Sequence, residues 1–197
     1  RADLDPHLST CRVLLRFHVS APRARSAVGA AVRAPVVGGN PADKGQLLGT
    51  IDLRSAFNVG SIFRTADTAR IASILTCGYT AHPPHARLEK TALGTLDYVQ
   101  SSHFDSALDA IADLQSRGVA VFALETTSHS KSYAAVEFPQ PVALVLGNEA
   151  LGIDREVMAA CDELIEIPVF GYKNSLNVAS ACAVVLFEIL RGWHGQV

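Results

Sequence analysis

The chain has 197 residues, of which 49% are hydrophobic and 18% are charged, and its formal net charge is −2. This length corresponds to one ordinary domain, or to a smaller domain with a tail. The apolar content excludes disorder for most of the chain, and no stretch approaches the ~18 uninterrupted apolar residues of a membrane span.

Residues 11–40 differ in composition from the rest of the chain. They contain five Arg, six Ala and no acidic residue. Such segments resemble mitochondrial or chloroplast transit peptides; the alternative is a disordered extension or translated upstream sequence. We therefore expect residues 1–44 to lie outside the fold and 45–197 to form one domain. The localisation is expected to be cytoplasmic, or chloroplast or mitochondrial if 11–40 is a transit segment.

Apolar runs of strand length recur from Gln46 onward and are bounded by turn residues. Because these runs are nearly continuous rather than alternating, they indicate strands buried on both faces, as in a parallel sheet. The predicted strands are 47–53, 72–78, 119–124, 142–147 and 164–169.

Helical patterns separate these strands. Asn58 is expected to cap a helix that runs to about Arg70, Asp105 opens a helix that Gly118 ends, and Ser175 starts the last helix, with Ser175 or Asn174 as its cap. Strands separated by single helices predict an α/β fold with a mostly parallel sheet flanked by helices. Ligands of such sheets bind at the carboxyl ends of the strands, here after residues 53, 124, 147 and 168.

The cysteines and the charge distribution restrict the possible functions. The four cysteines, Cys11, Cys77, Cys161 and Cys182, form no C-x-x-C or C-x-x-H pair, so we expect reduced thiols. Residues 101–170 contain three basic and eleven acidic residues. A protein that coats nucleic acid shows a broad basic surface, so any nucleic-acid site here is expected to be local and in the first half of the chain.

The first candidate segment runs from Asn58 to Asp67 and follows the first predicted strand. Gly60 allows another backbone or a ligand to approach closely. Arg64 is either a functional cation or the partner of Asp67 in an ion pair at i, i+3.

The second and third candidate segments follow later strands. In the segment Leu146–Ile153, Gly147 precedes Glu149 and Gly152 follows it, which indicates a tight loop with exposed backbone amides. It is neither a Rossmann fingerprint nor a P-loop. Residues 167–179 place Asn177 in the first turn of an apolar helix, where a buried amide needs a hydrogen bond; a local cap is the alternative.

In chain order these segments read N-x-G-x-x-x-R-T-A, L-G-N-E-x-x-G and I-P-x-x-G-x-x-x-S-L-N-V-A. This order resembles the three motifs of the SpoU/TrmH branch of the SPOUT RNA methyltransferases, over about residues 47–192. The segment His82–Gly94 is also similar to a loop in short members of that family.

The resemblance implies a SPOUT α/β fold with a C-terminal trefoil knot, an exception to the rule against knots. It also implies a homodimer that uses S-adenosylmethionine to methylate a ribose 2′-hydroxyl of tRNA or rRNA. By position, the cofactor contacts are Leu124, Gly147, Ile167, Ser175 and Leu176, and the catalytic residues are Arg64, Glu149, Asn177, Asn58 and Ser175.

The role of Arg64 implied by family accounts is that of a general base. A guanidinium stays protonated in proteins, so stabilisation of a developing alkoxide is the easier role. Glu149 would orient Asn58 or Arg64, and Asn177 and Ser175 would hold the ribose or position the loop.

Arg87 and Lys90 are the candidates for RNA phosphate contacts, and solvated charges are the alternative. His82 and His85 lack further ligands in the sequence, so no metal is expected. A SPOUT-like protein that binds RNA without catalysis is the alternative function. The sequence does not specify which RNA or which nucleotide is modified.

Overall fold

The structure is a computed structural model that describes residues 13–19, 45–51, 55–148 and 151–194. The strands are β1 (Val13–Val19), β2 (Gly45–Ile51), β3 (Ser73–Cys77), β4 (Gln100–Phe104), β5 (Ala120–Leu124), β6 (Lys131–Ser132), β7 (Val142–Leu146) and β8 (Glu163–Glu166). The helices are α1 (Ala56–Thr68), α2 (Ala86–Ala92), α3 (Ala107–Ser116), α4 (Arg155–Ala160) and α5 (Val178–His194), with short 3-10 turns at Thr95–Asp97 and Tyr133–Ala135.

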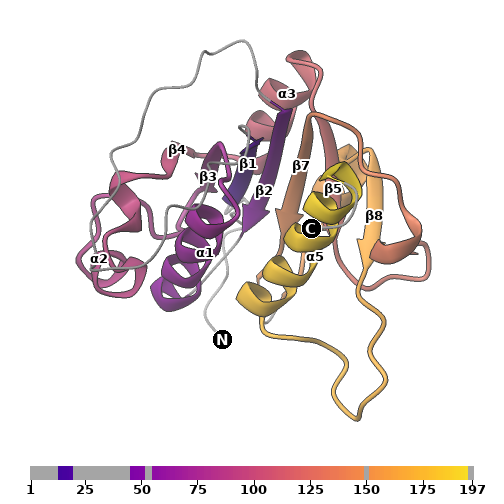
Figure 1. The fold of residues 1–197 in the computed structure, drawn as a ribbon. Coiled ribbons are helices and arrows are strands. Elements are labelled where there is room, and N and C mark those ends of the chain that lie inside the picture. Colours follow the sequence, from indigo (N-terminus) through magenta and orange to yellow (C-terminus); the bar gives the residue numbers. More distant parts are fainter. Residues whose placement is uncertain (1–12, 20–44, 52–54, 149–150, 195–197) are drawn as a thin grey trace, which may run out of the picture.

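The described strands form one sheet in the order β4-β3-β1-β2-β7-β5-β8-β6. The pairings β2–β3, β2–β7, β3–β4, β5–β7, β5–β8 and β6–β8 are parallel, whereas β1 is antiparallel to β2, β3 and β7. Helices cover both faces of the sheet (Figure 1). The predicted α/β class, with a mostly parallel sheet flanked by helices, is confirmed.

β7 lies inside the sheet and is buried on both faces. Val142, Leu144 and Leu146 belong to the apolar cluster that α1, α2 and α5 cover, whereas Ala143 and Val145 belong to the cluster beneath α3 and α4. This alternation follows from the two-residue period of a strand. It explains why the strand reads as a continuous apolar run in the sequence.

The five predicted strands are present with ends that differ by a few residues. Strand β4 was not predicted, because its sequence QSSHF has no apolar run and its first three residues are exposed. Strand β1 also lies in the sheet, although Val13–Val19 belongs to the range that the sequence analysis placed outside the fold. The high Arg and Ala content of residues 11–40 conceals the short apolar run VLLRFHV. Residues 1–12 and 20–44 lie outside the described residues.

The predicted helix starts were partly wrong. Ser55, not Asn58, is the N-cap residue of α1. The helix expected to open at Asp105 begins at Ala107, and Ser106 caps it by accepting a hydrogen bond from the Leu108 amide. The predicted end of α3 is confirmed: Gly118 has a φ of 72°, a left-handed conformation that glycine adopts without strain. Residues Ala86–Ala92, described above as part of a loop, form α2.

Among the described cysteines, Cys77 and Cys182 are buried and Cys161 is partly buried, and no disulfide joins any two of them; Cys11 lies outside the described residues. Burial raises the pKa of the Cys182 thiol well above its ordinary value, so this side chain behaves as an apolar core residue. None of the described helices is both long and apolar enough to cross a membrane.

Candidate active site

The larger cavity has a volume of about 740 Å³ and lies where β5, β7 and β8 end. In Figure 1 the arrows of β7 and β8 point to this end, and the connection from β8 to α5 extends below it. Three of the segments selected by the carboxyl-end rule, after residues 124, 147 and 168, therefore meet in one cavity. Its lining includes the predicted cofactor contacts Leu124, Gly147, Ile167, Ser175 and Leu176.

The loop after β7 forms one wall of this cavity and folds back tightly on itself. The Asn148 amide donates to the Gly152 carbonyl (3.1 Å), and the Gly152 amide donates to the Asn148 carbonyl (2.9 Å). A Cβ atom at Gly147 would lie 2.5 Å from the Gly152 carbonyl carbon and 2.7 Å from the Ile153 nitrogen. Gly147 is thus required by the close return of its own loop. Glu149, the predicted acidic residue of this segment, lies outside the described residues.

Glu125 is a cavity residue that the sequence analysis missed. Its Oε2 accepts a hydrogen bond from the Ile153 amide (2.8 Å), and its Oε1 accepts one from the Thr126 amide (3.2 Å). Gly152 has a φ of 70°, and a Cβ there would lie 2.6 Å from Glu125 Oε2. The carboxylate therefore fixes the end of the glycine loop. Its position directly after the strand 119–124 was a signal that could have identified it.

Asn177 connects two of the predicted motifs. Its Oδ1 accepts hydrogen bonds from the Ala179 amide (3.0 Å) and the Ser180 amide (3.3 Å), so Asn177 caps α5. Its Nδ2 donates to Oδ1 of Asn58 (3.2 Å). Asn58 belongs to α1 and is 9% exposed. The prediction that Ser175 or Asn174 caps this helix was wrong. Because Asn177 lines the larger cavity, its hydrogen bond to Asn58 means that Asn58 lies at the edge of that cavity.

Gly60 allows a close approach, as expected, but of a neighbouring helix rather than a ligand. A Cβ at Gly60 would lie 1.9 Å from Thr91 Oγ1 and 2.9 Å from the Ala92 nitrogen in α2. Thr91 Oγ1 donates to the carbonyl of Ala56 in α1 (3.2 Å). The glycine of the first motif thereby fixes the position of α2.

Arg64 lies on α1 and is exposed to solvent. It is not among the residues that line the larger cavity. No ion pair joins it to Asp67, although both residues are described, so the structural alternative for Arg64 is not realised. The guanidinium is left accessible to a ligand that approaches α1 from solvent.

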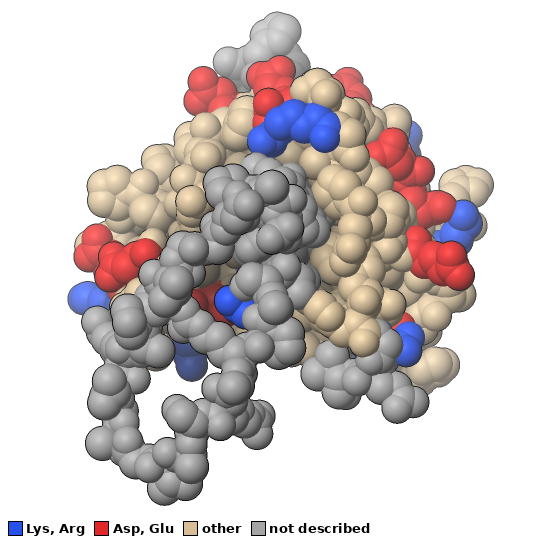
Figure 2. All heavy atoms as spheres, turned by 45° about the horizontal axis from the view of Figure 1, so that its top comes forward, with Lys and Arg blue, Asp and Glu red and all other residues tan. Residues whose placement is uncertain are grey.

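Arg87 and Lys90 are both exposed on α2, and Arg87 lines a second, smaller cavity. On the face drawn in Figure 2, basic and acidic side chains are interspersed among uncharged ones. This face shows no single broad basic area in the part of the chain that is described. The described residues of this face therefore favour a local contact with nucleic acid over a broad one.

His82 and His103 stack at a ring-centroid distance of 3.9 Å. Burial lowers the pKa of the His103 imidazole, and the neighbouring His82 lowers it further, whereas Asp105 and the Gly78 carbonyl act in the opposite direction. Among the described residues, no group of three or more His, Cys, Asp or Glu side chains is placed to hold a metal ion.

A mostly parallel sheet with a ligand-sized cavity at its carboxyl edge, lined by the second and third motifs and bordered by Asn58 of the first, is typical of an α/β protein that binds a small molecule. The sequence model of the SpoU rRNA Methylase family matches residues 47–187, and this chain belongs to that family.

Relatives and solved structures agree with this assignment. The tRNA (guanosine(18)-2'-O)-methyltransferase of Escherichia coli (strain K12) is 30% identical over 137 residues, covering 68% of this chain and 58% of that protein. The AdoMet-bound rRNA methyltransferase of Sinorhizobium meliloti has a TM-score of 0.67 at 30% identity, covering 74% of this chain and 54% of that one. The A. aeolicus TrmH/SpoU tRNA modifying enzyme has a TM-score of 0.64 at 26% identity, with 72% of each chain covered. The chain thus spans little more than half the length of the first two.

Proposed function

We propose that this protein transfers the methyl group of S-adenosylmethionine to a ribose 2′-hydroxyl of tRNA or rRNA. The observation that carries the proposal is the Asn177–Asn58 hydrogen bond at the edge of the larger cavity. It joins the first motif to the third at the place where the second also contributes its loop. Family membership and the AdoMet-bound relative support the same chemistry.

The larger cavity fits S-adenosylmethionine in size and in chemistry. Its volume of about 740 Å³ lies within the usual range of small-molecule sites. Leu124, Ile167 and Leu176 supply apolar surface for an adenine ring. The Glu125 carboxylate and the backbone of the Gly147–Gly152 loop supply polar groups for hydroxyls, the ammonium and the cationic sulfonium.

When bound, the cofactor supplies an electrophilic methyl group on a sulfonium. The protein's part is to hold the ribose oxygen in line with that methyl group, which contributes through orientation alone. Asn58 and Asn177 are hydrogen-bonded to each other at the cavity edge, which supports their proposed role of orienting the ribose. Ser175 lines the cavity beside them.

Arg64 has an electrostatic role in this proposal. Because arginine side chains are cationic in proteins, this residue stabilises the developing charge on the 2′-oxygen or contacts the adjacent phosphate. Its exposure on α1 supports contact with an RNA strand that approaches from solvent. Glu149 keeps its expected role of orienting Asn58 or Arg64, as a prediction from the sequence.

The C-terminal trefoil knot and the homodimer belong to the same proposal. The knot is supported by membership of the family and concerns the segment that connects β8 to α5. The dimer is supported by exposed apolar side chains on that segment and on α5: Phe170 is 97% exposed and Phe187 is 50% exposed. Exposed apolar surface of this kind is typical of an interface with another protein.

The proposal is tested by calorimetric titration of the protein with S-adenosylmethionine, followed by transfer of tritium from labelled cofactor to pools of unmodified tRNA and rRNA transcripts. We expect saturable binding and, after digestion of the RNA, a 2′-O-methylated nucleoside. Cofactor binding without any transfer to either pool would favour an RNA-binding protein without catalysis. Absence of cofactor binding would contradict the proposal.

A further inference from the structure

A second cavity of about 350 Å³ lies beyond the carboxyl end of β3. It is formed by the turn that follows β3, by the segment that leads into α2 and by the first residue of α1. Its lining residues are Ala56, Gly78, Tyr79, Thr80, Ala81, His82, Pro84, His85 and Arg87. Its volume is at the lower end of the range for ligand sites, about 300–1,000 Å³.

The lining of this cavity combines aromatic rings with a cation. Tyr79, His82 and His85 supply the rings and Arg87 supplies the charge, and no carboxylate is among the lining residues. The His82 ring stacks on the His103 ring with an interplanar angle of 27°, and this contact holds the orientation of His82. Aromatic side chains on which bases stack, together with basic groups for the phosphates, are the features that bind single-stranded RNA.

Tyr79 connects this cavity to the larger one. Asn148 Nδ2 donates a hydrogen bond to the Tyr79 hydroxyl oxygen (3.1 Å), and Asn148 lines the larger cavity. Tyr79 itself lines the second cavity and is 56% exposed. One hydrogen bond therefore joins a residue that lines the larger cavity to a residue that lines the second one.

We propose that the second cavity binds a nucleotide of the RNA substrate that neighbours the methylated one. Tyr79 and His82 stack on its base, and Arg87 contacts its phosphate. This inference rests on the proposed function, because it assumes that the methylated ribose lies at the larger cavity. It assigns substrate positioning to a segment that the three motifs do not include.

The test compares three variants with the unaltered protein. Tyr79→Leu removes the stacking ring, His82→Ala removes the second ring, and Tyr79→Phe keeps the ring but loses the hydroxyl. The affinity for a pool of unmodified tRNA and rRNA transcripts is measured by filter binding, and the affinity for S-adenosylmethionine by calorimetry. We expect Tyr79→Leu and His82→Ala each to weaken RNA binding about tenfold. Tyr79→Phe should retain RNA binding, and cofactor affinity should change less than about twofold in all three.

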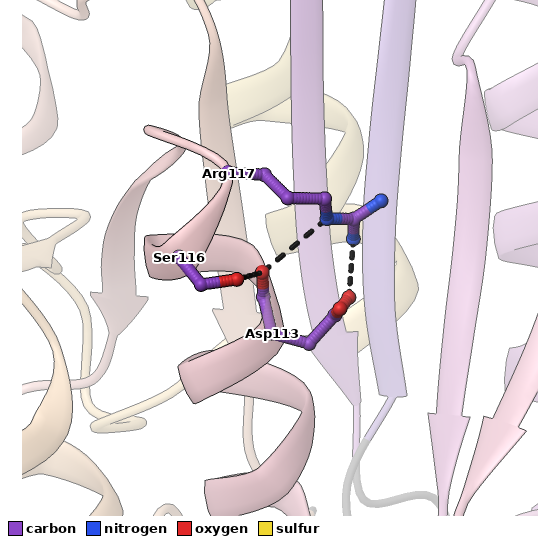
Figure 3. Close-up of polar contacts among 3 residues, drawn as sticks. All are labelled: Asp113, Ser116 and Arg117. Carbon is purple, nitrogen blue, oxygen red and sulfur yellow. Dashed lines mark hydrogen bonds and ion pairs between the residues drawn. The ribbon is translucent and has the colours of Figure 1, made fainter.

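Arg117 provides the matched control for Arg87. It lies just after α3, near the start of β5 and thus at the opposite end of the sheet, where it pairs with Asp113 beside Ser116 (Figure 3). Arg87→Gln should weaken RNA binding and reduce its dependence on salt concentration, because a phosphate contact releases counterions. Arg117→Gln should leave both unchanged. Equal effects of the two substitutions would overturn the assignment of Arg87.

The outcomes separate this inference from the proposed function. If the unaltered protein methylates RNA and the Tyr79→Leu and His82→Ala variants bind RNA equally well, the inference is overturned and the proposed function stands. If the unaltered protein binds RNA without methylating it and these variants lose affinity, the cavity is supported as an RNA site and only the proposed function fails.

A second experiment needs no variant. RNA transcripts that carry 4-thiouridine are irradiated in complex with the unaltered protein, and the crosslinked peptides are identified by mass spectrometry. Crosslinks within residues 78–87 support the inference. Crosslinks confined to other segments overturn it.

Discussion

Asn177 donates a hydrogen bond to Asn58 across 119 positions of the chain, at 3.2 Å. The same Asn177 side chain caps α5 through two backbone amides. One residue thus begins the last helix and connects it to the first helix at the edge of the larger cavity. The cap and the contact with Asn58 together explain why an amide stands at the start of an otherwise apolar helix.

Substitution of Asn177 should separate the two roles. Asn177→Ala removes the cap and should lower the free energy of unfolding by about 1–2 kcal/mol. Asn177→Ser keeps a capping oxygen but is too short to reach Asn58, so it should restore most of the stability without restoring methyl transfer. Chemical denaturation and tritium transfer measure the two effects. Full activity of Asn177→Ser would show that the Asn58 contact has no functional role.

Gly152 should not tolerate a side chain. Gly152→Ala places a Cβ 2.6 Å from Glu125 Oε2 at a residue with a φ of 70°, and the left-handed conformation alone costs about 1–2 kcal/mol. We expect lower stability and weaker binding of S-adenosylmethionine, because the Glu125 contact to the loop is displaced. Gly171→Ala is the matched control, since a Cβ there meets nothing within 4 Å. Similar calorimetric affinities for the two variants would refute this account of the loop.

Two glycines of helices should respond in opposite directions to alanine. Gly60→Ala overpacks the contact with Thr91 and should lower the free energy of unfolding by about 1–3 kcal/mol. Gly192→Ala, in α5, has open space around its Cβ and should raise stability by up to about 1 kcal/mol through helix propensity. Urea denaturation measures both. An unchanged free energy of unfolding for Gly60→Ala would mean that α2 can shift away from α1 at no cost.

The lowered pKa of His103 should make stability depend on pH. Below its ordinary value of 6.5, the unfolded chain binds a proton that the folded protein does not, so the free energy of unfolding falls as pH decreases from 6.5 toward the lowered pKa. His103→Gln should reduce this slope, because it removes the titrating imidazole and, with it, the charge interaction with His82. His129→Gln, at an exposed histidine, is the control and should keep the slope. Unfolding at a series of pH values measures it; identical slopes for both variants would contradict the assignment.

Arg64 should affect methyl transfer more than cofactor binding. Arg64→Gln is expected to lower the rate of transfer about 100- to 1000-fold, the usual loss when one stabilising group is removed, with little change in the calorimetric affinity for S-adenosylmethionine. Arg191→Gln, another exposed arginine, should leave both quantities unchanged. An Arg64→Gln variant with normal activity would remove this residue from the proposed site.

The sequence predicts the parallel sheet well because buried strands carry nearly continuous apolar runs. It also predicts which strand ends meet, since the carboxyl-end rule follows from topology alone. Polar connections are harder to predict. An Asn near a helix start suits a cap by composition, and only the packing of α1 against α5 shows that Asn58 instead faces Asn177.

Residues that act through long-range contacts were missed for a similar reason. Tyr79 carries no motif, and its contact with Asn148 joins segments 69 positions apart. Thr91 is recognised as the partner of Gly60 only once α2 is seen to pack on α1. Strand β4 was not predicted because a polar edge strand lacks the apolar pattern on which strand prediction depends.

A crystal structure of the protein with S-adenosylmethionine tests the central claim most directly. The account predicts the cofactor in the larger cavity, in contact with Leu124, the Gly147 loop and Ser175. Its methyl group should face the side on which Asn58 and Asn177 meet. Cofactor bound at another site, or a titration to saturating concentration without binding, would contradict it.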